Sequence, residues 1–238
     1  MARPRARRGE EAWPVAMPHD GVVPSDAGTA KVRGGRGVIT ASAMRHFHAK
    51  GFHATTMRDI AAGADITVAS IYHHFDSKQV ILQEIMVSSL SDSLATTRDA
   101  VLGAGGSATE QLRALVAAWV GFHIGRRPEA MIGASELRSL DAGGRRLVFT
   151  LRQEQARLFY GVIERGVAEG DFATAYPREC AKGIISMGVA VSTWYEEDGP
   201  LRREDVVERF VDLALGTARA REPDGPAPRG PGSGSAGA

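Results

Sequence analysis

Five of the seven histidines lie between residues 46 and 74, a density that raises the question of a metal site. In a helix His46 and His48 would point about 200° apart around the axis, and His73 and His74 about 100° apart. Neither pair can therefore chelate one ion from a single helix face. The chain has one cysteine and no His-Glu-x-x-His pattern. We predict no metal site.

Cys180 is the strongest nucleophile of the chain, and it lies in a segment with helical periodicity and no matching catalytic constellation. A buried structural thiol is the usual case for such a residue. The sequence also has no phosphate-binding glycine loop and no serine elbow. We therefore expect neither a catalytic site nor a cofactor.

Residues 55–78 suit contact with DNA, because they describe two short helices joined by a tight turn. Thr56 can cap the first helix and Thr67 the second. Asp65 lies in the turn and tolerates the left-handed backbone that such turns often need. With Ile71 facing the core, the second helix keeps small and polar residues on its outer side, which suits a major groove.

The segment from about Ile39 to Met86 resembles the DNA-binding domain of the TetR family of transcriptional regulators. The resemblance rests on the order and spacing of four blocks: Ala-Met-Arg-His-Phe (43–47), Gly-Phe (51–52), Thr-Met-Arg-Asp-Ile-Ala (56–61) and Ser-Ile-Tyr-His-His-Phe-Asp-Ser-Lys (70–78). Two positions depart from the family pattern. Asp65 stands where the family mostly has Gly, and Val68 where it often has Lys, so the operator sequence cannot be copied from relatives.

The resemblance implies a set of DNA contacts. Tyr72, His73 and Lys78 match positions that touch backbone phosphates, and Thr56 offers a hydroxyl for the same purpose. The residues expected to face base edges are Thr67, Val68, Ala69 and Ser70. The net charge of the chain is only +1. DNA binding must therefore depend on local basic clusters, to which Arg36 is expected to contribute.

Helical periodicity and helix-end signals continue to about residue 218, without competing strand alternation. Gly51 is expected to stop a first helix over 37–50. The helices expected after the head are a fourth starting after Ser77, one opened by a capping box at 107–110, a short one through Leu140, one over 145–169, one from Pro177 to about 196, and one ending near Ala218. The predicted fold is all-α, with a three-helix helix-turn-helix head and a larger helical ligand-binding and dimerisation domain.

The predicted organisation is a disordered basic arm (1–32), the DNA-binding domain (33–92), a regulatory and dimerisation domain (93–219) and a disordered tail (220–238). The Arg-rich start is a solvated tail, the result of an upstream misassigned start codon, or a flexible arm that adds phosphate contacts or reaches a minor groove. No apolar run is long enough to span a bilayer, and no signal-peptide core follows the basic start. We expect a cytoplasmic protein without a membrane partner.

The second half, roughly residues 110–217, resembles a TetR subgroup whose regulators respond to acyl-CoA thioesters in fatty-acid or steroid catabolism. The resemblance rests on three blocks, at 136–140, 163–172 and 194–201. It implies a ligand class and a dimer interface made by the last two helices. The last helix also has an apolar face too broad for one small neighbour, formed by Val206, Val207, Phe210, Val211, Ala214 and Leu215.

Aromatic and Met side chains on the regulatory helices suit a cavity that accepts an acyl or polycyclic group. The candidate ligand-binding residues are Trp119, His123, Phe149, Gln153, Met187 and Trp194. The alternative for each is simple core packing. Gly183 and Gly188 weaken their helix, which indicates either close helix packing or room for a ligand.

These observations predict a homodimeric, sequence-specific repressor that binds a near-palindromic double-stranded operator. A small apolar effector, such as an acyl-CoA, would release it from DNA. Two alternatives remain open. One is a helical ligand-binding module without DNA binding, suggested by Val68 and the low net charge; the other is an enzyme on a helical scaffold. Activator output is also compatible with the sequence.

Overall fold

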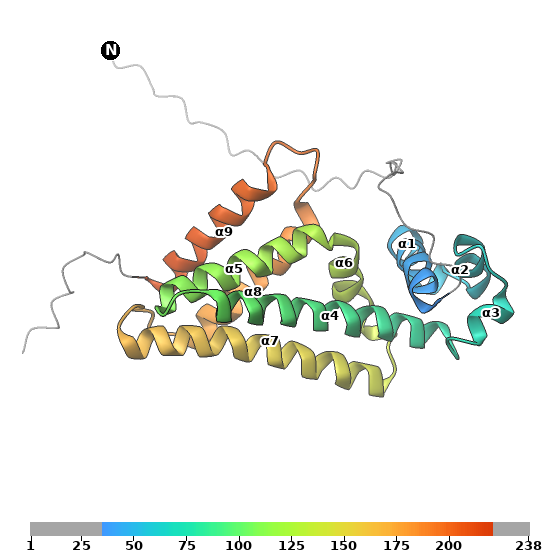
Figure 1. Cartoon of the computed structure of the whole chain (residues 1–238), viewed down its shortest axis with the longest axis horizontal. Helices are drawn as coiled ribbons and strands as arrows, with labels where there is room; N and C mark the ends of the chain where they lie inside the picture. Colours follow the sequence, from blue (N-terminus) through green and yellow to red (C-terminus); the bar gives the residue numbers. More distant parts are fainter. Residues whose placement is uncertain (1–34, 221–238) are drawn as a thin grey trace, which may run out of the picture. The chain divides into compact units, whose positions relative to one another are not determined.

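The computed structural model describes residues 35–220, and its fold there is helical. The α-helices are α1 (Arg36–Ala54), α2 (Met57–Gly63), α3 (Val68–Tyr72), α4 (Lys78–Gly103), α5 (Ala108–Gly125), α6 (Arg127–Ser135), α7 (Ala142–Glu169), α8 (Pro177–Trp194) and α9 (Arg203–Ala218) (Figure 1). A 3-10 helix, η1 (Glu136–Ser139), follows α6. The all-α prediction is confirmed, because the only pairing of β type within 35–220 is an isolated bridge between Phe172 and Ala220.

The predicted arm over 1–32 and the predicted tail over 220–238 lie outside the described residues, apart from Ala220. Within the described part of the chain, no helix combines the length and apolarity that crossing a bilayer requires.

Capping side chains set the starts of the helices. Thr56, Thr67, Ser77, Ser107 and Asp141 each accept a hydrogen bond from a backbone N–H in the first turn of their helix. Such caps satisfy amide groups that have no partner inside the helix. Asp141 makes α7 begin at Ala142, three residues earlier than the helical periodicity predicted.

Glycines with positive φ set two of the helix ends. Gly51, at φ 81° and ψ 162°, is non-helical and stops the first stretch of α1 after residue 50, as predicted; a separate short turn continues to Ala54. Gly170, at φ 86°, ends α7 at the predicted position. In the turn before α3, Asp65 has φ 54°, the left-handed conformation expected from the sequence.

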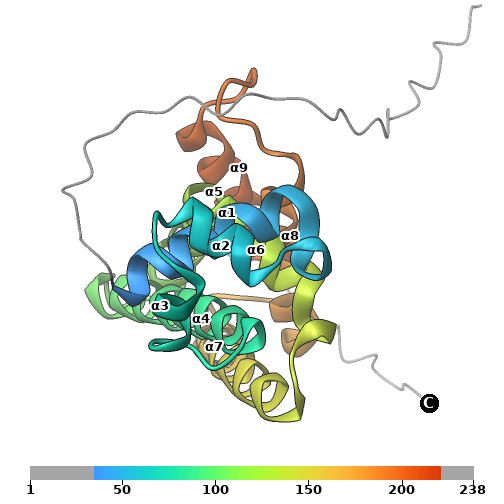
Figure 2. The same cartoon turned by 90° about the vertical axis from the view of Figure 1, so that its right-hand side faces the viewer.

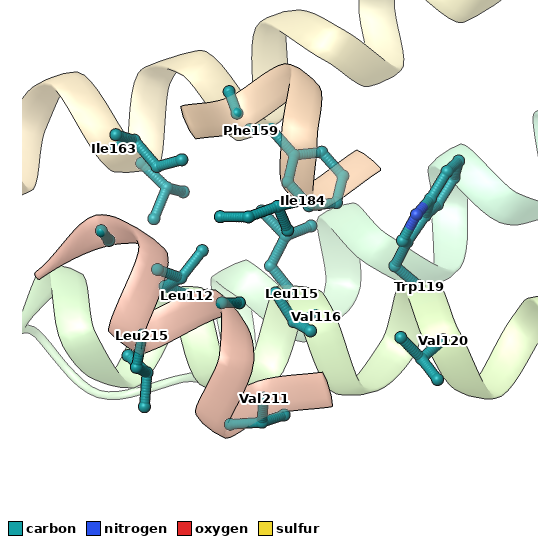
Figure 3. Packing of buried hydrophobic residues seen from close by; sticks show 14 of the residues in the cluster. Leu112, Leu115, Val116, Trp119, Val120, Phe159, Ile163, Ile184, Val211 and Leu215 are labelled. Carbon is teal, nitrogen blue, oxygen red and sulfur yellow. The ribbon is translucent and has the colours of Figure 1, made fainter. Parts of the chain in front are cut away.

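The buried apolar residues of 35–220 form two clusters. The head cluster joins α1 to α4 and also includes Ile132 of α6, Leu140 and Val148 of α7. The body cluster joins α5, α7, α8 and α9; Figure 3 shows Trp119, Phe159 and Ile184 within it. The head core therefore takes residues from the predicted regulatory domain, which local periodicity did not indicate.

Helix α4 joins the two clusters, since it packs on α1 and also on α5 and α7 (Figure 1). It runs without a break through residues 92 and 93, where the sequence analysis divided the domains. Helix α6 packs against α1, α4 and α8 (Figure 2). Two helices thus connect the head to the body.

Candidate functional site

The start of α2 is held by reciprocal hydrogen bonds. The hydroxyl of Thr56 accepts from the backbone N–H of Asp59 at 3.2 Å, and Asp59 Oδ2 accepts from the N–H of Thr56 at 2.7 Å. Lys50 Nζ lies 2.8 Å from the same carboxylate. The side-chain bond from Lys50, followed by the bonds from Thr56, lowers the pKa of Asp59 well below its usual range. The Thr56 side chain is exposed to solvent, but its hydroxyl already takes part in the cap of α2.

Helix α3 is short and anchored on one side. Ile71 within it is 0% exposed, and Phe75 just after it is 1% exposed. Thr67 caps the helix, with its Oγ1 3.1 Å from the backbone nitrogen of Ser70. The other side is open: Thr67, Ala69, Tyr72 and His73 are exposed, and Val68 and Ser70 are partly exposed. These six candidate DNA contacts belong to α3 and the residues that cap it, and we call them together the α3 face.

Two basic candidates lie off the α3 face and are engaged inside the molecule. Lys78 Nζ donates to the carbonyl oxygens of Phe52 and Thr55, each at 2.6 Å, and lies 4.4 Å from the centre of the Phe52 ring. Burial lowers the pKa of Lys78, while the charges of Asp59 and Glu136 oppose that shift. The ammonium group thus closes the C-terminal end of α1.

Arg36 is engaged in a similar way. Its guanidinium forms an ion pair with Glu84 of α4, donates to the carbonyl oxygen of His74 at 2.6 Å and lies 4.1 Å from the centre of the Phe75 ring. About half of its side chain remains exposed, at 48%. Arg36 therefore ties α1 to α4 and to the segment after α3, and contact with a phosphate would have to compete with Glu84.

A cavity of about 340 Å³ lies inside the body, between α4, α5, α6, α7 and α8. Its apolar wall includes Met86, Leu90, Trp119, Phe122, Ile185 and Val189. This volume falls at the lower end of the range of small-molecule sites, roughly 300–1,000 Å³. The cavity can therefore enclose a compact apolar group.

Two of the six ligand candidates line this cavity. The rings of Trp119 and His123 pack at an angle of 60° with their centres 4.2 Å apart, and Trp119 Nε1 donates to the carbonyl oxygen of Ile185 at 3.1 Å. His123 Nδ1 lies 2.9 Å from the carbonyl oxygen of Trp119. Burial lowers the pKa of His123, only partly offset by that bond.

The other four candidates do not line it. Phe149 is 62% exposed in an open hollow on α7, Gln153 is exposed, and Met187 packs against the body cluster. Trp194 is 41% exposed at the end of α8 and stacks on Phe210 of α9, with ring centres 6.0 Å apart.

Sequence reasoning missed five polar residues of the cavity wall, which are Ser89, Ser93, Glu129, Arg152 and Gln155. A signal for Ser93 was present, because it continues the apolar stripe of Met86 and Leu90 at helical spacing. Gln155 Nε2 donates to the Thr97 hydroxyl at 3.0 Å. Arg152 donates to the carbonyl oxygen of Gly133 at 2.8 Å, which ties α7 to α6.

The end of α6 and η1 form a polar junction with the head. Ser139 Oγ lies 3.2 Å from His53 Nε2 and donates to Glu136 at 2.8 Å. Gln79 of α4 donates to the carbonyl oxygen of Ser139 at 3.3 Å. Since α6 also lines the cavity through Glu129, one helix contacts both the cavity and the head.

The described residues contain no group of three or more His, Cys, Asp or Glu side chains that could hold a metal ion. The fold and site together define a helix-turn-helix DNA-binding protein with a ligand-sized cavity in a helical body. A profile for bacterial regulatory proteins of the tetR family matches residues 39–85, and one for the tetracyclin repressor-like C-terminal domain matches 105–218. The chain belongs to the TetR family of transcriptional regulators, as predicted. It is a DNA-binding regulator and not an enzyme.

Named relatives agree with this assignment. The HTH-type transcriptional repressor KstR2 of Mycolicibacterium smegmatis is 31% identical over 172 residues, covering 71% of this chain and 83% of that protein. The solved ketosteroid transcriptional regulator KstR2 of Mycobacterium tuberculosis has a TM-score of 0.72 and 27% identity, covering 82% of this chain and 99% of that one. AibR in complex with isovaleryl coenzyme A and operator DNA shares the fold, with a TM-score of 0.68 and 22% identity over 75% of this chain and 96% of that one.

Proposed function

We propose that this regulator is a homodimeric repressor, acting in the cytoplasm, that leaves its operator when a small apolar effector enters the body cavity. The observation that carries the DNA-binding half is the α3 face, anchored by Ile71 and open on its outer side. Such a helix fits a major groove, with Val68 and Ala69 against base edges and Tyr72 and His73 near phosphates. Thr67 and Ser70 supply hydroxyl groups at the same edge.

The homodimer is supported by the α8 and α9 surface. Much of the apolar face of α9 is used within the chain, since Val206, Val211 and Ala214 are buried in the body cluster. Leu213 remains 53% exposed, and Trp194 on α8 lies beside Phe210. A two-fold dimer through this surface would place two heads on successive major grooves about 34–36 Å apart.

An acyl-CoA is our proposed effector class. KstR2 is named a ketosteroid regulator, and AibR shows that this fold can bind a coenzyme A thioester. The cavity can hold about eleven water-sized groups at roughly 30 Å³ each, which suits an acyl group but not a whole coenzyme A. Arg152 lines both the cavity and the neighbouring hollow, which also holds Arg145 and Arg146. The phosphates would lie over these three guanidinium groups.

Helices α4 and α6 would transmit binding, because both line the cavity and both contact the head. The effector must bind more tightly to the form of the dimer whose two heads do not match the spacing of successive major grooves. An effector with equal affinity for both forms would not shift the equilibrium between them.

The direct test is to select bound duplexes from a random pool with the purified full chain, and then titrate isovaleryl-CoA and larger acyl-CoA thioesters against the complex. We expect an inverted repeat and loss of DNA at saturating effector. Unchanged affinity for DNA would defeat the induction model. If no duplex is selected, and if the logarithm of the affinity for DNA does not fall linearly with the logarithm of the salt concentration, the chain is instead a helical ligand-binding module that does not bind DNA.

A further inference from the structure

Ser93 lies on the cavity wall with its hydrogen-bonding capacity unused. The residue is 2% exposed, and no atom within residues 35–220 forms a hydrogen bond with its Oγ. A serine inside a helix commonly bonds the carbonyl four residues earlier, but Ser93 does not bond Ser89 in this way. Leaving a buried hydroxyl without a partner is costly, so this position requires an explanation beyond packing.

His123 supplies a second polar atom on the same wall. A carbonyl oxygen can only accept, so the 2.9 Å contact with the oxygen of Trp119 places the proton on Nδ1. Burial lowers the pKa of His123, which favours the neutral ring. Nε2 is then an acceptor, and no hydrogen bond within residues 35–220 involves it.

Ser93 and His123 line the same cavity from α4 and α5, two helices that pack against each other. Asp92, next to Ser93, forms an ion pair of 3.5 Å with Arg126, the residue that follows the end of α5. Ser93 can donate and His123 can accept. The apolar rings of Trp119 and Phe122 lie on the same wall, and of the other polar side chains there Gln155 and Arg152 already donate to Thr97 and Gly133. A ligand hydroxyl satisfies both groups at once, whereas a ketone would satisfy Ser93 alone.

We propose that the effector carries a hydroxyl group on the apolar body that enters the cavity, and that Ser93 and His123 together select it. This inference rests on the proposed role of the cavity as the effector site. The hydroxyl donates to His123 Nε2 and accepts from Ser93 Oγ.

The test uses three rigid probes of about ten or eleven non-hydrogen atoms, matched to the cavity volume: decahydro-2-naphthol, 2-decalone and decalin. Their affinities for the full chain are measured by calorimetry in the absence of DNA. Two neutral hydrogen bonds should make the alcohol bind about tenfold tighter than the hydrocarbon, with the ketone between them.

Three variants locate the effect. Ser93→Ala should reduce the preference for alcohol over hydrocarbon about fivefold while leaving decalin binding unchanged. His123→Asn keeps a donor near the Trp119 oxygen but lacks the Nε2 acceptor, so it should bind alcohol and ketone alike. Ser91→Ala, on an exposed position of α4, is the matched control and should change none of the affinities.

Equal binding of alcohol and ketone by the unmodified chain would overturn the proposal. A Ser93→Ala variant that weakens all three probes equally would do the same, and so would failure of every probe to bind. Operator binding is measured separately and without probe. Loss of the hydroxyl preference would therefore leave the repressor proposal intact, and failure to bind DNA would leave the hydroxyl preference to be judged independently.

Discussion

Lys78 shows how a residue type that matches a DNA contact can have a structural task. Its ammonium group serves the last carbonyls of α1, at Phe52 and Thr55. Lys78→Met removes these charge-assisted bonds, together with a longer one to the His53 oxygen at 3.4 Å, and leaves the Phe52 oxygen only the bond from the Thr55 N–H. We expect the free energy of unfolding in urea to fall by about 1–2 kcal/mol, because the site is partly exposed to solvent. Lys182→Met, at an exposed position on α8, should lower it by less than about 0.5 kcal/mol.

Variants of Tyr72 and Val68 should distinguish contacts to backbone phosphates, which affect all DNA sequences alike, from contacts to base edges, which affect sequence preference. Tyr72 is 52% exposed and its hydroxyl forms no hydrogen bond within residues 35–220. Tyr72→Phe should weaken binding to all operator sequences about fivefold, measured by fluorescence anisotropy, without changing stability. Val68→Ala should instead alter the preference at one base pair. Tyr176→Phe, at a 70% exposed position before α8, is the control, and a loss of equal size there would argue against a specific contact.

His123 should give the fold a defined acid sensitivity. Burial lowers its pKa below the ordinary value of 6.5. Below about pH 6.5 the unfolded chain therefore binds a proton that the folded chain does not, and stability falls as the pH drops, by at most about 1.4 kcal/mol per unit. Above that pH the contribution is complete. Denaturation from pH 7.5 to 5.5 should show a smaller loss in His123→Asn than in the unmodified chain. Glu129 and Arg152 are the other ionisable side chains that line the cavity near His123. If the unmodified chain and His123→Asn lost stability equally as the pH falls, His123 would not be the source of the acid sensitivity.

At the scale of the helix, α8 contains two glycines with opposite surroundings. A Cβ added at Gly188 would lie 2.2 Å from Trp119 Cδ1, and the ring is held by its bond to the Ile185 oxygen. A Cβ at Gly183 would meet nothing within 4 Å. We expect Gly188→Ala to destabilise the chain by about 1–3 kcal/mol through overpacking. Gly183→Ala should stabilise it by about 0.5–1 kcal/mol through helix propensity.

Thermal or urea unfolding of these two variants tests the packing directly, since they make the same chemical change on one helix. Equal effects would show that Trp119 can move aside. A large loss at Gly188 would instead establish that this glycine gives the cavity wall the space it requires.

Helix ends were predictable because they depend on local chemistry. Thr56, Thr67, Ser107 and Gly170 act where their side chains or backbone freedom indicated. The start of α7 was missed because Asp141 lies outside the apolar repeat that was used to place it, although aspartate is a common N-cap.

The cavity wall was less predictable than the helix ends. Gln153 and Gln155 are two residues apart, so they point about 200° away from each other, and only the packed helix decides which faces inward. The sequence analysis predicts Gln153 as a ligand-binding residue, whereas in the structure Gln155 lines the cavity. Ile132 and Leu140 reach the head cluster only through contacts between segments distant in sequence, and no local pattern contains that information.

At the scale of the whole regulator, the cavity and the α3 face are connected through shared helices. Helix α6 contributes Glu129 to the cavity and Ile132 to the head cluster, and the following η1 contacts His53 of α1 through Ser139. Helix α4 also touches both regions. An effector that displaces α6 would therefore disturb the packing of the head itself, in addition to any change in the direction of α4.

Dimerisation is the property on which the spacing of two heads depends, and Leu213 gives the clearest test. It is 53% exposed on α9, close to the surface that includes Trp194 and Phe210. Leu213→Glu would bury a charge without a partner in a two-fold interface. We expect sedimentation equilibrium to show a monomer. Affinity for the inverted repeat should fall at least about a hundredfold, because the second head loses its effective concentration.

Leu102→Glu provides the matched control, because Leu102 is 82% exposed near the end of α4, a helix that packs mainly on α1, α5, α6 and α7. It should remain dimeric and bind DNA normally. Affinity for a single half-site should be the same in both variants, since the α3 face is untouched. If Leu213→Glu stays dimeric, the two-fold interface must lie elsewhere on the protein. If it becomes monomeric but still binds the full repeat tightly, two heads on one duplex are not required for recognition.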